Sequence, residues 1–345
     1  MVAAPPVLPN ITDVARRAKV STATVSRVVN APDSVRAELR QRVEAAIAQL
    51  GYVPHAGART LKSRRTGTIG AIFPTVDNAI FAKAIDALQR RLAEAGYPLL
   101  IATCDYDPAI EASQALNLLT RGADALVLCG SGQPQSLLTR LRERGVPVVH
   151  VMSWPLPAGH TGVGFDNARA MGQAVRYLVD LGHRRIAMLA GVTRDNDRAA
   201  ARVRGVREAL EAARLSLPAS RLVERPYTLS AAREGLRQLL DTSPAPTAVV
   251  CGNDVLAFGA LFEAERLGIA VPRDLSIVGF DDLEMASHWK PALTTIHVPA
   301  EQMWQRAAEH VIALTRGEAP VRNHEVDVSL IVRESTAPPL RRSRR

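Results

Sequence analysis

A run of short hydroxyl side chains with one arginine lies near the start of the chain, in STATVSR at residues 21–27. Hydroxyl groups bond phosphates or base edges, threonine methyls meet the thymine methyl, and arginine binds guanine through two hydrogen bonds. At the N-terminal end of a helix, these residue types suit the reading of a DNA major groove. An ordinary pair of packed helices remains the alternative for this stretch taken alone.

Small apolar residues must position this run. Two apolar faces recur at helical spacing within residues 11–30, namely Val14, Ala15 and Ala18, then Val25, Val28 and Val29. Thr12 is a plausible N-cap of the first helix, and Ser21 or Thr22 caps the second. A third helix is predicted over about 35–50, after a turn that contains Pro32. The first 52 residues therefore predict a small helical module.

The positive charge of the chain is concentrated at its ends. Residues 1–65 hold eleven Lys or Arg against four acids, the last five residues add four arginines, and the net charge of the whole chain is +9. Residues 66–340 therefore carry about −2. A basic N-terminal module on a nearly neutral body is typical of a polyanion binder, most often a nucleic-acid binder. A GC-rich coding sequence would raise the arginine content everywhere and does not explain this asymmetry.

From Gly67 onward, short apolar runs such as TIGAIF, ALVLC, AVVCGND and LSIVGFDD alternate with helical segments. This pattern predicts parallel strands buried on both faces of an α/β sheet. The alternation is too long for one sheet, so we expect two Rossmann-like lobes, starting near Gly67 and near Asp166, with a return crossing near His297. The stretch EVDVSLIVRES is expected to complete this body. Ligands of such sheets bind at the carboxyl ends of the strands, here in a cleft between the lobes.

Several function classes lack their sequence signals. Cys104, Cys129 and Cys251 are odd in number and lie in apolar runs, which indicates reduced core residues rather than a disulfide or a metal site. The chain shows no secretion signal and no apolar run of about 18 residues, so we expect a cytoplasmic protein that does not enter the membrane. Nucleotide-binding, hydrolase and zinc-protease motifs are absent, so neither an enzyme nor a cofactor is expected. An exported transport protein would not need the basic module.

Seven stretches of the chain resemble the LacI/GalR family of bacterial transcription repressors, and they occur in the family's order. They are ITDVARRAKVSTATVSRVVN, VRAELRQRVEAAIAQLGYVPHAGARTLKSRRTGTIGAIFP, GHRRIAMLAG, RVRGVREAL, CGNDVLAFGA, DLSIVGFDD and PALTTIHVP. The resemblance implies a helix-turn-helix headpiece joined to a periplasmic-binding-protein-like α/β core of two Rossmann-like lobes. It divides the chain into a flexible N-terminus (1–10), headpiece (11–53), hinge (54–66), core (67–336) and basic tail (337–345). VGFDN and IGAIFPTVDNAIF are most similar to the gluconate-repressor branch.

The resemblance implies a homodimer that places the second helix of each headpiece in the major groove of a near-palindromic, double-stranded operator. Thr22 and Ala23 are the expected specificity residues, and Arg27 is the expected base or phosphate contact. The full set implied in the headpiece is Thr12, Lys19, Ser21, Thr22, Ala23, Thr24, Ser26, Arg27 and Asn30. Lys19 stands where many members have glycine, and a left-handed backbone there would cost about 1 kcal/mol.

Residues 54–63 resemble the family's hinge, which forms a short helix only on DNA. Leu61 is expected to enter the central base step of the minor groove and bend the duplex, and a flexible pyrimidine-purine step would ease the bend. His55, Arg59 and Lys62 are expected to contact the groove or backbone. Gly57 departs from the pattern and costs about 1 kcal/mol in a helix relative to alanine.

For the cleft, the resemblance implies that Arg202, Asn253 and Asp281 hold a small-molecule effector, with Asn78 and Phe81 on the opposite wall. Arg202 could instead be an exposed helix arginine, and Asp281 a helix cap. Trp154 could stack on a pyranose ring or anchor its loop, and Asn10, Met152 and Phe165 are weaker candidates. The branch resemblance suggests a sugar or sugar acid, and the charges of residues 194–198 would suit an anion. The tail APPLRRSRR lacks leucine heptads, which favours a dimer over a tetramer.

Overall fold

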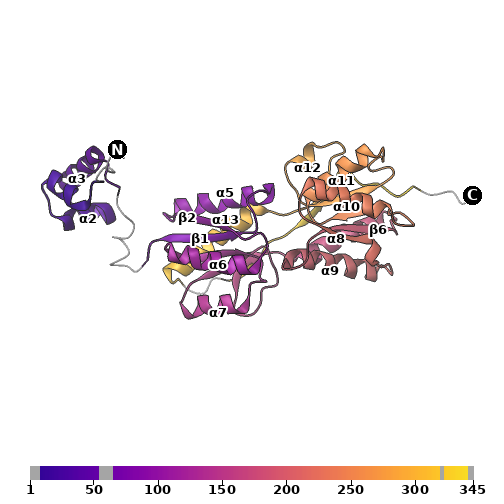
Figure 1. Ribbon diagram of the computed structural model, residues 1–345, viewed down its shortest axis with the longest axis horizontal. Helices are drawn as coiled ribbons and strands as arrows, with labels where there is room; N and C mark the ends of the chain where they lie inside the picture. The colour runs from indigo at the N-terminus through magenta and orange to yellow at the C-terminus, as the bar shows by residue number, and fades with distance from the viewer. Residues whose placement is uncertain (1–7, 54–64, 319–321, 341–345) are drawn as a thin grey trace, which may run out of the picture. The chain divides into compact units, whose positions relative to one another are not determined.

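The computed structural model describes residues 8–53, 65–318 and 322–340 (Figure 1). The chain divides into two compact units, residues 1–66 and residues 67–345. Within the described residues, none of the helices is long and apolar enough to cross a membrane.

The first unit is helical. It contains α1 (Ile11–Ala18), α2 (Thr22–Asn30), a short 3-10 turn (Pro32–Ser34) and α3 (Ala37–Leu50). Its core is built from buried small residues of all three helices and from Tyr52, which follows α3; the small residues are Val14, Ala15, Ala18, Val25, Val28, Val43 and Ala46. Short side chains let these short helices cross closely, and this is the reason for the density of Val and Ala in the sequence.

The caps of α1 and α2 fix where these helices begin. Asn10 caps α1: its Oδ1 accepts from the Thr12 nitrogen (2.8 Å), and its own nitrogen donates to Asp13 Oδ2 (3.0 Å). The expectation that Thr12 caps this helix is therefore wrong, because Thr12 lies inside its first turn. Ser21 caps α2 by accepting from the Thr24 nitrogen (3.1 Å). Lys19 ends α1 in the left-handed conformation (φ 51°) that the turn requires.

The second unit holds two six-stranded sheets. Sheet A has the order β11-β5-β4-β3-β1-β2, and sheet B has the order β12-β10-β9-β8-β6-β7. The strands are β1 (Thr68–Phe73), β2 (Leu99–Thr103), β3 (Ala123–Cys129), β4 (Val148–Val151), β5 (Thr161–Gly164), β6 (Ile186–Gly191), β7 (Leu222–Arg225), β8 (Ala248–Cys251), β9 (Ser276–Asp281), β10 (Thr294–His297), β11 (His324–Glu325) and β12 (Ser329–Ile331). Neighbouring strands are parallel, apart from the antiparallel pair β10 and β12.

Helices cover both faces of each sheet, as the continuous apolar strands require. The longer helices are α5 (Ala79–Glu94), α6 (Pro108–Thr120), α7 (Gln135–Glu143), α8 (Asn167–Asp180), α9 (Asp197–Ala212), α10 (Leu229–Leu240), α11 (Asp254–Arg266) and α13 (Ala300–Arg316), with a short α12 (Met285–His288). In Figure 1, α5 and α13 lie on one side of sheet A and α6 and α7 on the other, while sheet B lies between α8–α9 and α10–α11.

The chain crosses between the lobes three times. It leaves sheet A after β5, returns after β10 so that α13 packs beside α5, and crosses again between β11 and β12. The expected crossing near His297 is confirmed. The stretch EVDVSLIVRES, residues 325–335, was expected to form one last strand, but residues 324–331 supply a short edge strand to each sheet. We refer to the lobe of sheet A as the first lobe and to that of sheet B as the second lobe.

Helices α8 and α9 cross closely at Gly205. A Cβ atom at this position would lie 2.1 Å from the carbonyl oxygen of Ala168, which is backbone and cannot turn aside. We therefore expect Gly205→Ala to destabilise the second unit by about 2 kcal/mol or more, although alanine favours helices by about 1 kcal/mol. Gly172→Ala on the facing helix is the matched control, since its Cβ would meet the flexible end of Arg176 at 3.1 Å. Equal urea midpoints for the two variants would contradict this account.

Candidate nucleic-acid interface and effector cleft

The N-terminal end of α2 presents the residues predicted to read DNA. Ser21, Thr22, Ala23 and Arg27 are exposed, while Thr24 and Ser26 are half-buried. Ser21 and Thr24 also share a hydroxyl hydrogen bond of 2.9 Å, so their polar groups help to hold the cap. Of the residues predicted to read DNA at this end of α2, Thr22, Ala23 and Arg27 are exposed and take no part in the cap.

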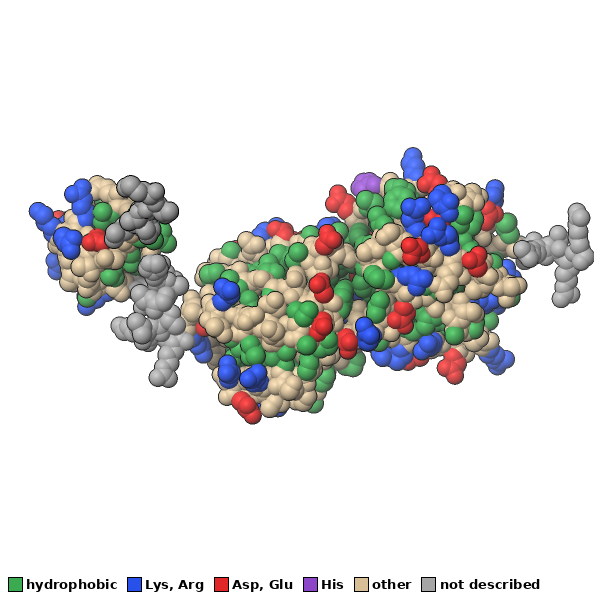
Figure 2. Space-filling view, in the orientation of Figure 1, with side chains coloured by type: hydrophobic (Ala, Val, Ile, Leu, Met, Phe, Trp, Pro, Cys, Tyr) green, Lys and Arg blue, Asp and Glu red, His purple; other side chains and the backbone are tan. Residues whose placement is uncertain are grey.

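Other predicted DNA contacts in this unit fall into two groups. Thr12 and Lys19 are exposed near the two ends of α1, and basic side chains stand on the visible face of the unit (Figure 2). The side chain of Asn30 and the hinge candidates His55, Arg59, Leu61 and Lys62 lie outside the described residues.

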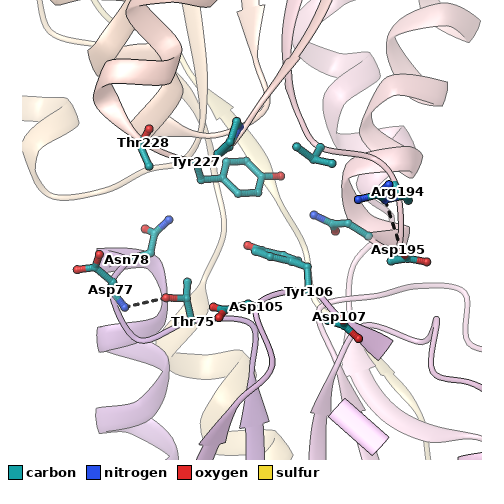
Figure 3. Close-up of a pocket in the computed structure, with 13 residues that line it drawn as sticks. Thr75, Asp77, Asn78, Asp105, Tyr106, Asp107, Arg194, Asp195, Tyr227 and Thr228 are labelled. Carbon is teal, nitrogen blue, oxygen red and sulfur yellow. Dashed lines mark hydrogen bonds and ion pairs between the residues drawn. The ribbon is translucent and has the colours of Figure 1, made fainter. Parts of the chain in front are cut away.

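A cleft between the two lobes holds a cavity of about 440 Å³, at the carboxyl ends of their strands (Figure 3). The first lobe contributes Thr75, Asp77, Asn78, Asp105, Tyr106 and Asp107, and the second contributes Val192, Arg194, Asp195, Asn196, Pro226, Tyr227 and Thr228. We call this space the outer chamber. Asn78 belongs to the predicted set, and its Oδ1 also accepts from the Ile80 nitrogen (3.2 Å) at the start of α5.

A much smaller space of about 20 Å³ lies deeper between the lobes, and we call it the inner chamber. Four of the predicted residues line it, namely Phe81, Arg202, Asn253 and Asp281. It also shares Tyr106, Asn196 and Tyr227 with the outer chamber. Residues as far apart in the sequence as Phe81 and Asp281 thus meet at one site, as the topology predicts.

Arg202 is a buried arginine with several partners rather than an exposed helix residue. It donates to Asn167 Oδ1 (2.9 Å) and to the carbonyl oxygen of Gly252 (2.7 Å), and its guanidinium carbon lies 3.8 Å from the centre of the Phe280 ring. Its Nη2 lies 3.9 Å from Asp281 Oδ1. The side chain is therefore held in a fixed position at the wall of the inner chamber.

The remaining predicted residues differ in their surroundings. Asn253 caps α11 by accepting from the Leu256 nitrogen (2.9 Å), so it has a structural role beside its place in the inner chamber. Phe165 is fully buried against Phe280, with ring centres 5.9 Å apart. Phe165 and Trp154 do not line the two chambers. Met152 lines the inner chamber, whereas Asn10 caps α1 in the other unit.

Comparison with known proteins decides the family. A family profile described as bacterial regulatory proteins of the lacI family matches residues 10–55, and a periplasmic binding protein-like domain matches residues 175–336. The repressor PurR of Klebsiella pneumoniae (strain 342) is 35% identical over 95% of this chain and 96% of its own length. The chain belongs to the LacI family.

Solved structures agree with this assignment. The transcription regulator GntR from Chromobacterium violaceum is 30% identical, with a TM-score of 0.74 over 78% of this chain and 99% of that one. The lac repressor dimer, bound to operator and the anti-inducer ONPF, is 27% identical, with a TM-score of 0.82 over 95% and 99%. This LacI-family chain is accordingly a DNA-binding transcriptional repressor and not an enzyme.

Sequence reasoning missed several residues of the repressor's cleft. Tyr106 follows β2 and Tyr227 follows β7, and their rings face each other from opposite lobes with centres 6.0 Å apart. Asn196 and Arg198, which belong to the charged stretch 194–198 noted in the sequence, line the inner chamber beside them. Both tyrosines lie just after strands, so the rule that ligands bind at carboxyl ends of strands could have found them.

The charged loop 194–198 makes contacts between the lobes. Asp197 Oδ2 accepts from the Ser131 nitrogen (2.8 Å) and from Ser153 Oγ (2.8 Å), both of the first lobe. Arg198 is buried beside Asp197, with Nη1 3.2 Å from Asp197 Oδ1. The charges of these two residues therefore compensate each other. Because Arg198 is already paired, this stretch is less suited to an anion than its sequence suggested.

Asp281 is the buried carboxyl group of the inner chamber. Within the described part of the chain, neither of its oxygens has a hydrogen-bond partner. Burial raises the pKa of Asp281 to about 7, although the Arg202 guanidinium lowers it. Its neighbour Asp254 also has a raised pKa, of about 8, because of burial and then of the Asp281 charge.

A pH-dependent stability follows from Asp281. A carboxyl group with a raised pKa in the folded state stabilises the protein below its ordinary pKa, and this contribution is lost as pH rises through about 7. The natural chain loses this contribution as pH rises, and Asp281→Asn has none to lose. We therefore expect the stability of the variant, relative to the natural chain, to increase by about 2–4 kcal/mol from pH 4 to pH 8. Thermal unfolding of both proteins across this range measures the difference. A gap that does not change with pH would contradict the raised pKa.

Proposed function

We propose that the repressor acts as a homodimer on a near-palindromic operator, with α2 of each headpiece in the major groove of one half-site. The observation that supports this best is the exposed set Thr22, Ala23 and Arg27 at the start of a helix capped by Ser21. Thr22 and Ala23 distinguish bases through hydroxyl and methyl contacts, while Arg27 binds a guanine or a phosphate. Residues 54–66 form the hinge in this proposal, and Leu61 enters the central base step.

A small polar effector, a sugar or a sugar acid, binds in the cleft and changes the orientation of the lobes. Its proposed contacts are Arg202, Asn253 and Asp281 in the second lobe and Asn78 and Phe81 in the first. The site supports this because side chains of both lobes border the same chambers. A ligand that binds one lobe arrangement more tightly shifts the equilibrium toward it. The protein would act where the DNA is, in the cytoplasm.

The direct test is operator binding by the purified chain, measured by fluorescence anisotropy on genomic fragments that include those beside its own coding region. Sequence-dependent affinity that falls with salt is expected. Arg27→Ala should lower the slope of log affinity against log salt by about 0.9 if the residue contacts a phosphate, or relax specificity at one base pair if it contacts a base. Arg144→Ala, an exposed arginine of the other unit, is the control. Equal affinity for every fragment would refute the proposal.

A further inference from the structure

Two facing tyrosines separate the chambers of the cleft. Tyr106 of the first lobe and Tyr227 of the second border both spaces, and Figure 3 shows their rings turned toward each other. The inner chamber, with about 20 Å³, has room for about one water molecule. The outer chamber, with about 440 Å³, has the size of a small-molecule site. In this arrangement of the lobes, a ring-sized ligand fits only on the outer side of the tyrosines.

The outer chamber is rich in carboxylates. Four aspartates and a single arginine line it, namely Asp77, Asp105, Asp107, Asp195 and Arg194. Two of the aspartates have other roles, because Asp107 caps α6 through the Ala109 nitrogen (2.7 Å) and Asp195 lies 3.9 Å from Arg194. Among the described residues, no hydrogen bond or ion pair engages the side chain of Asp77 or Asp105. Both are exposed at the chamber's first-lobe wall.

The deeper cations do not offset this negative charge. Arg198 is paired with Asp197 at 3.2 Å, and Arg202 lies 3.9 Å from Asp281. Asp281 adds a buried carboxyl group deeper in the cleft. Its side chain is 5% exposed, and its two oxygens have no hydrogen-bond partner within the described part of the chain. It lines the inner chamber, behind the tyrosines, and a further cavity beside the crossing segments, but it does not line the outer chamber.

We propose that the outer chamber binds a small organic cation, a molecule with a basic nitrogen, which lies against Tyr106 and Tyr227 and pairs with Asp77 and Asp105. This inference rests on the proposed effector role of the cleft, and it replaces the sugar acid with a ligand that carries a basic nitrogen, such as an amino sugar. The π-face of a tyrosine attracts a cation, and a carboxylate forms stronger hydrogen bonds with a charged donor than with a neutral one. A sugar acid would instead bring its carboxylate into a negatively charged chamber.

A third cavity of about 480 Å³ lies beside the crossing segments and is the rival location. It is lined by Lys83 and His297 as well as by acids, and its Asp282 is already engaged by Arg333 (2.7 Å) and His297 (2.9 Å). It therefore offers a cation fewer unengaged carboxylates than the outer chamber does. Substitution of Asp77 and Asp105 distinguishes the two places, since neither residue lines this third cavity.

The test uses the full chain and two matched sets of probes in calorimetric titrations at pH 7. One set is glucosamine, glucose and glucuronate, and the other is cyclohexylamine, cyclohexanol and cyclohexanecarboxylate. We expect the amine of at least one set to bind about tenfold or more tightly than its acid. Asp77→Asn with Asp105→Asn should remove this preference. Asn tolerates the left-handed backbone of Asp105 (φ 48°), and Asp180→Asn at the end of α8 is the matched control.

Each outcome decides the inference. Amine binding that depends on Asp77 and Asp105 supports it. An acid that binds as tightly as its amine overturns it, and so does amine binding that survives both substitutions, which would favour the third cavity. If no amine binds while the same protein still binds its operator, the cation class is wrong and the proposed repressor function stands. If operator binding is also missing, the proposed function itself fails.

Discussion

Arg202→Ala is expected to destabilise the second unit by about 3–5 kcal/mol and to abolish the response to effector. The substitution would leave Asp281 as a buried carboxyl group without its nearest cation, and it would remove the donors to Asn167 Oδ1 and to the Gly252 carbonyl oxygen. Because buried groups that lose a partner are costly, the loss should exceed that of an ordinary surface change. Urea unfolding measures the stability, and the change in operator affinity on addition of effector measures the response.

Two further variants test the reason for this effect. Arg207 lies on the same helix but on its exposed face, so Arg207→Ala should change the free energy of unfolding by about 0.5 kcal/mol or less. Adding Asp281→Asn to Arg202→Ala should recover part of the lost stability, since the uncompensated carboxyl group is then gone. If the double variant is as unstable as the sum of the two single variants, the pairing of Arg202 with Asp281 does not explain the loss.

The sequence was sufficient to predict the elements but not all of their ends. Hydrophobic spacing depends on neighbours within one or two turns, so the three headpiece helices and the buried strands could be read directly. The first cap was misjudged because both Asn10 and Thr12 are good cap residues. The acid three residues after Asn10 completes a capping box, and this spacing was the available signal. The split of residues 324–331 between two sheets depends on tertiary pairing, which periodicity does not report.

The candidate site was likewise predicted only in part, because some of its contacts depend on tertiary structure. Arg202, Asn253 and Asp281 were predicted from family resemblance and meet in the inner chamber. The approach of Tyr106 to Tyr227 and the bond from Ser131 to Asp197 were not predicted, because each joins residues of different lobes. Such contacts depend on how the lobes meet, which is set by the crossing segments rather than by any local pattern. The size of the inner chamber likewise could not be read from residue types.

The tyrosine pair and the Asp197 contacts have one consequence for the switch. Both join the lobes with the protein's own side chains. An effector that enters the inner chamber must therefore separate these contacts, whereas one bound in the outer chamber can leave them intact. A ligand shifts the balance only by its difference in affinity for the two arrangements. In the proposed function, an effector in the inner chamber would therefore favour an arrangement without these contacts, and one in the outer chamber could favour the arrangement that has them.

Leu61→Ala is expected to weaken specific operator binding by about 2–3 kcal/mol, or roughly a hundredfold, while the core keeps its stability. In the proposed complex, a leucine from each subunit enters the central base step, and the bend that results lets the duplex contact more protein. Alanine is too short to hold the step open, so the operator would lose the bend. The phosphate contacts of the headpiece do not depend on this residue, and weak salt-sensitive binding should remain.

Fluorescence anisotropy on operator and scrambled duplexes separates the two kinds of binding. Leu340→Ala, an exposed leucine in the tail segment, makes the same chemical change away from the headpiece and should keep the natural affinity. A flexible pyrimidine-purine step at the operator centre should make the Leu61 effect smaller than a stiff step does, because the deformation then costs less. If the Leu61→Ala variant still binds the operator as much more tightly than scrambled DNA as the natural chain does, specificity rests on α2 alone, and Leu61 does not enter the base step.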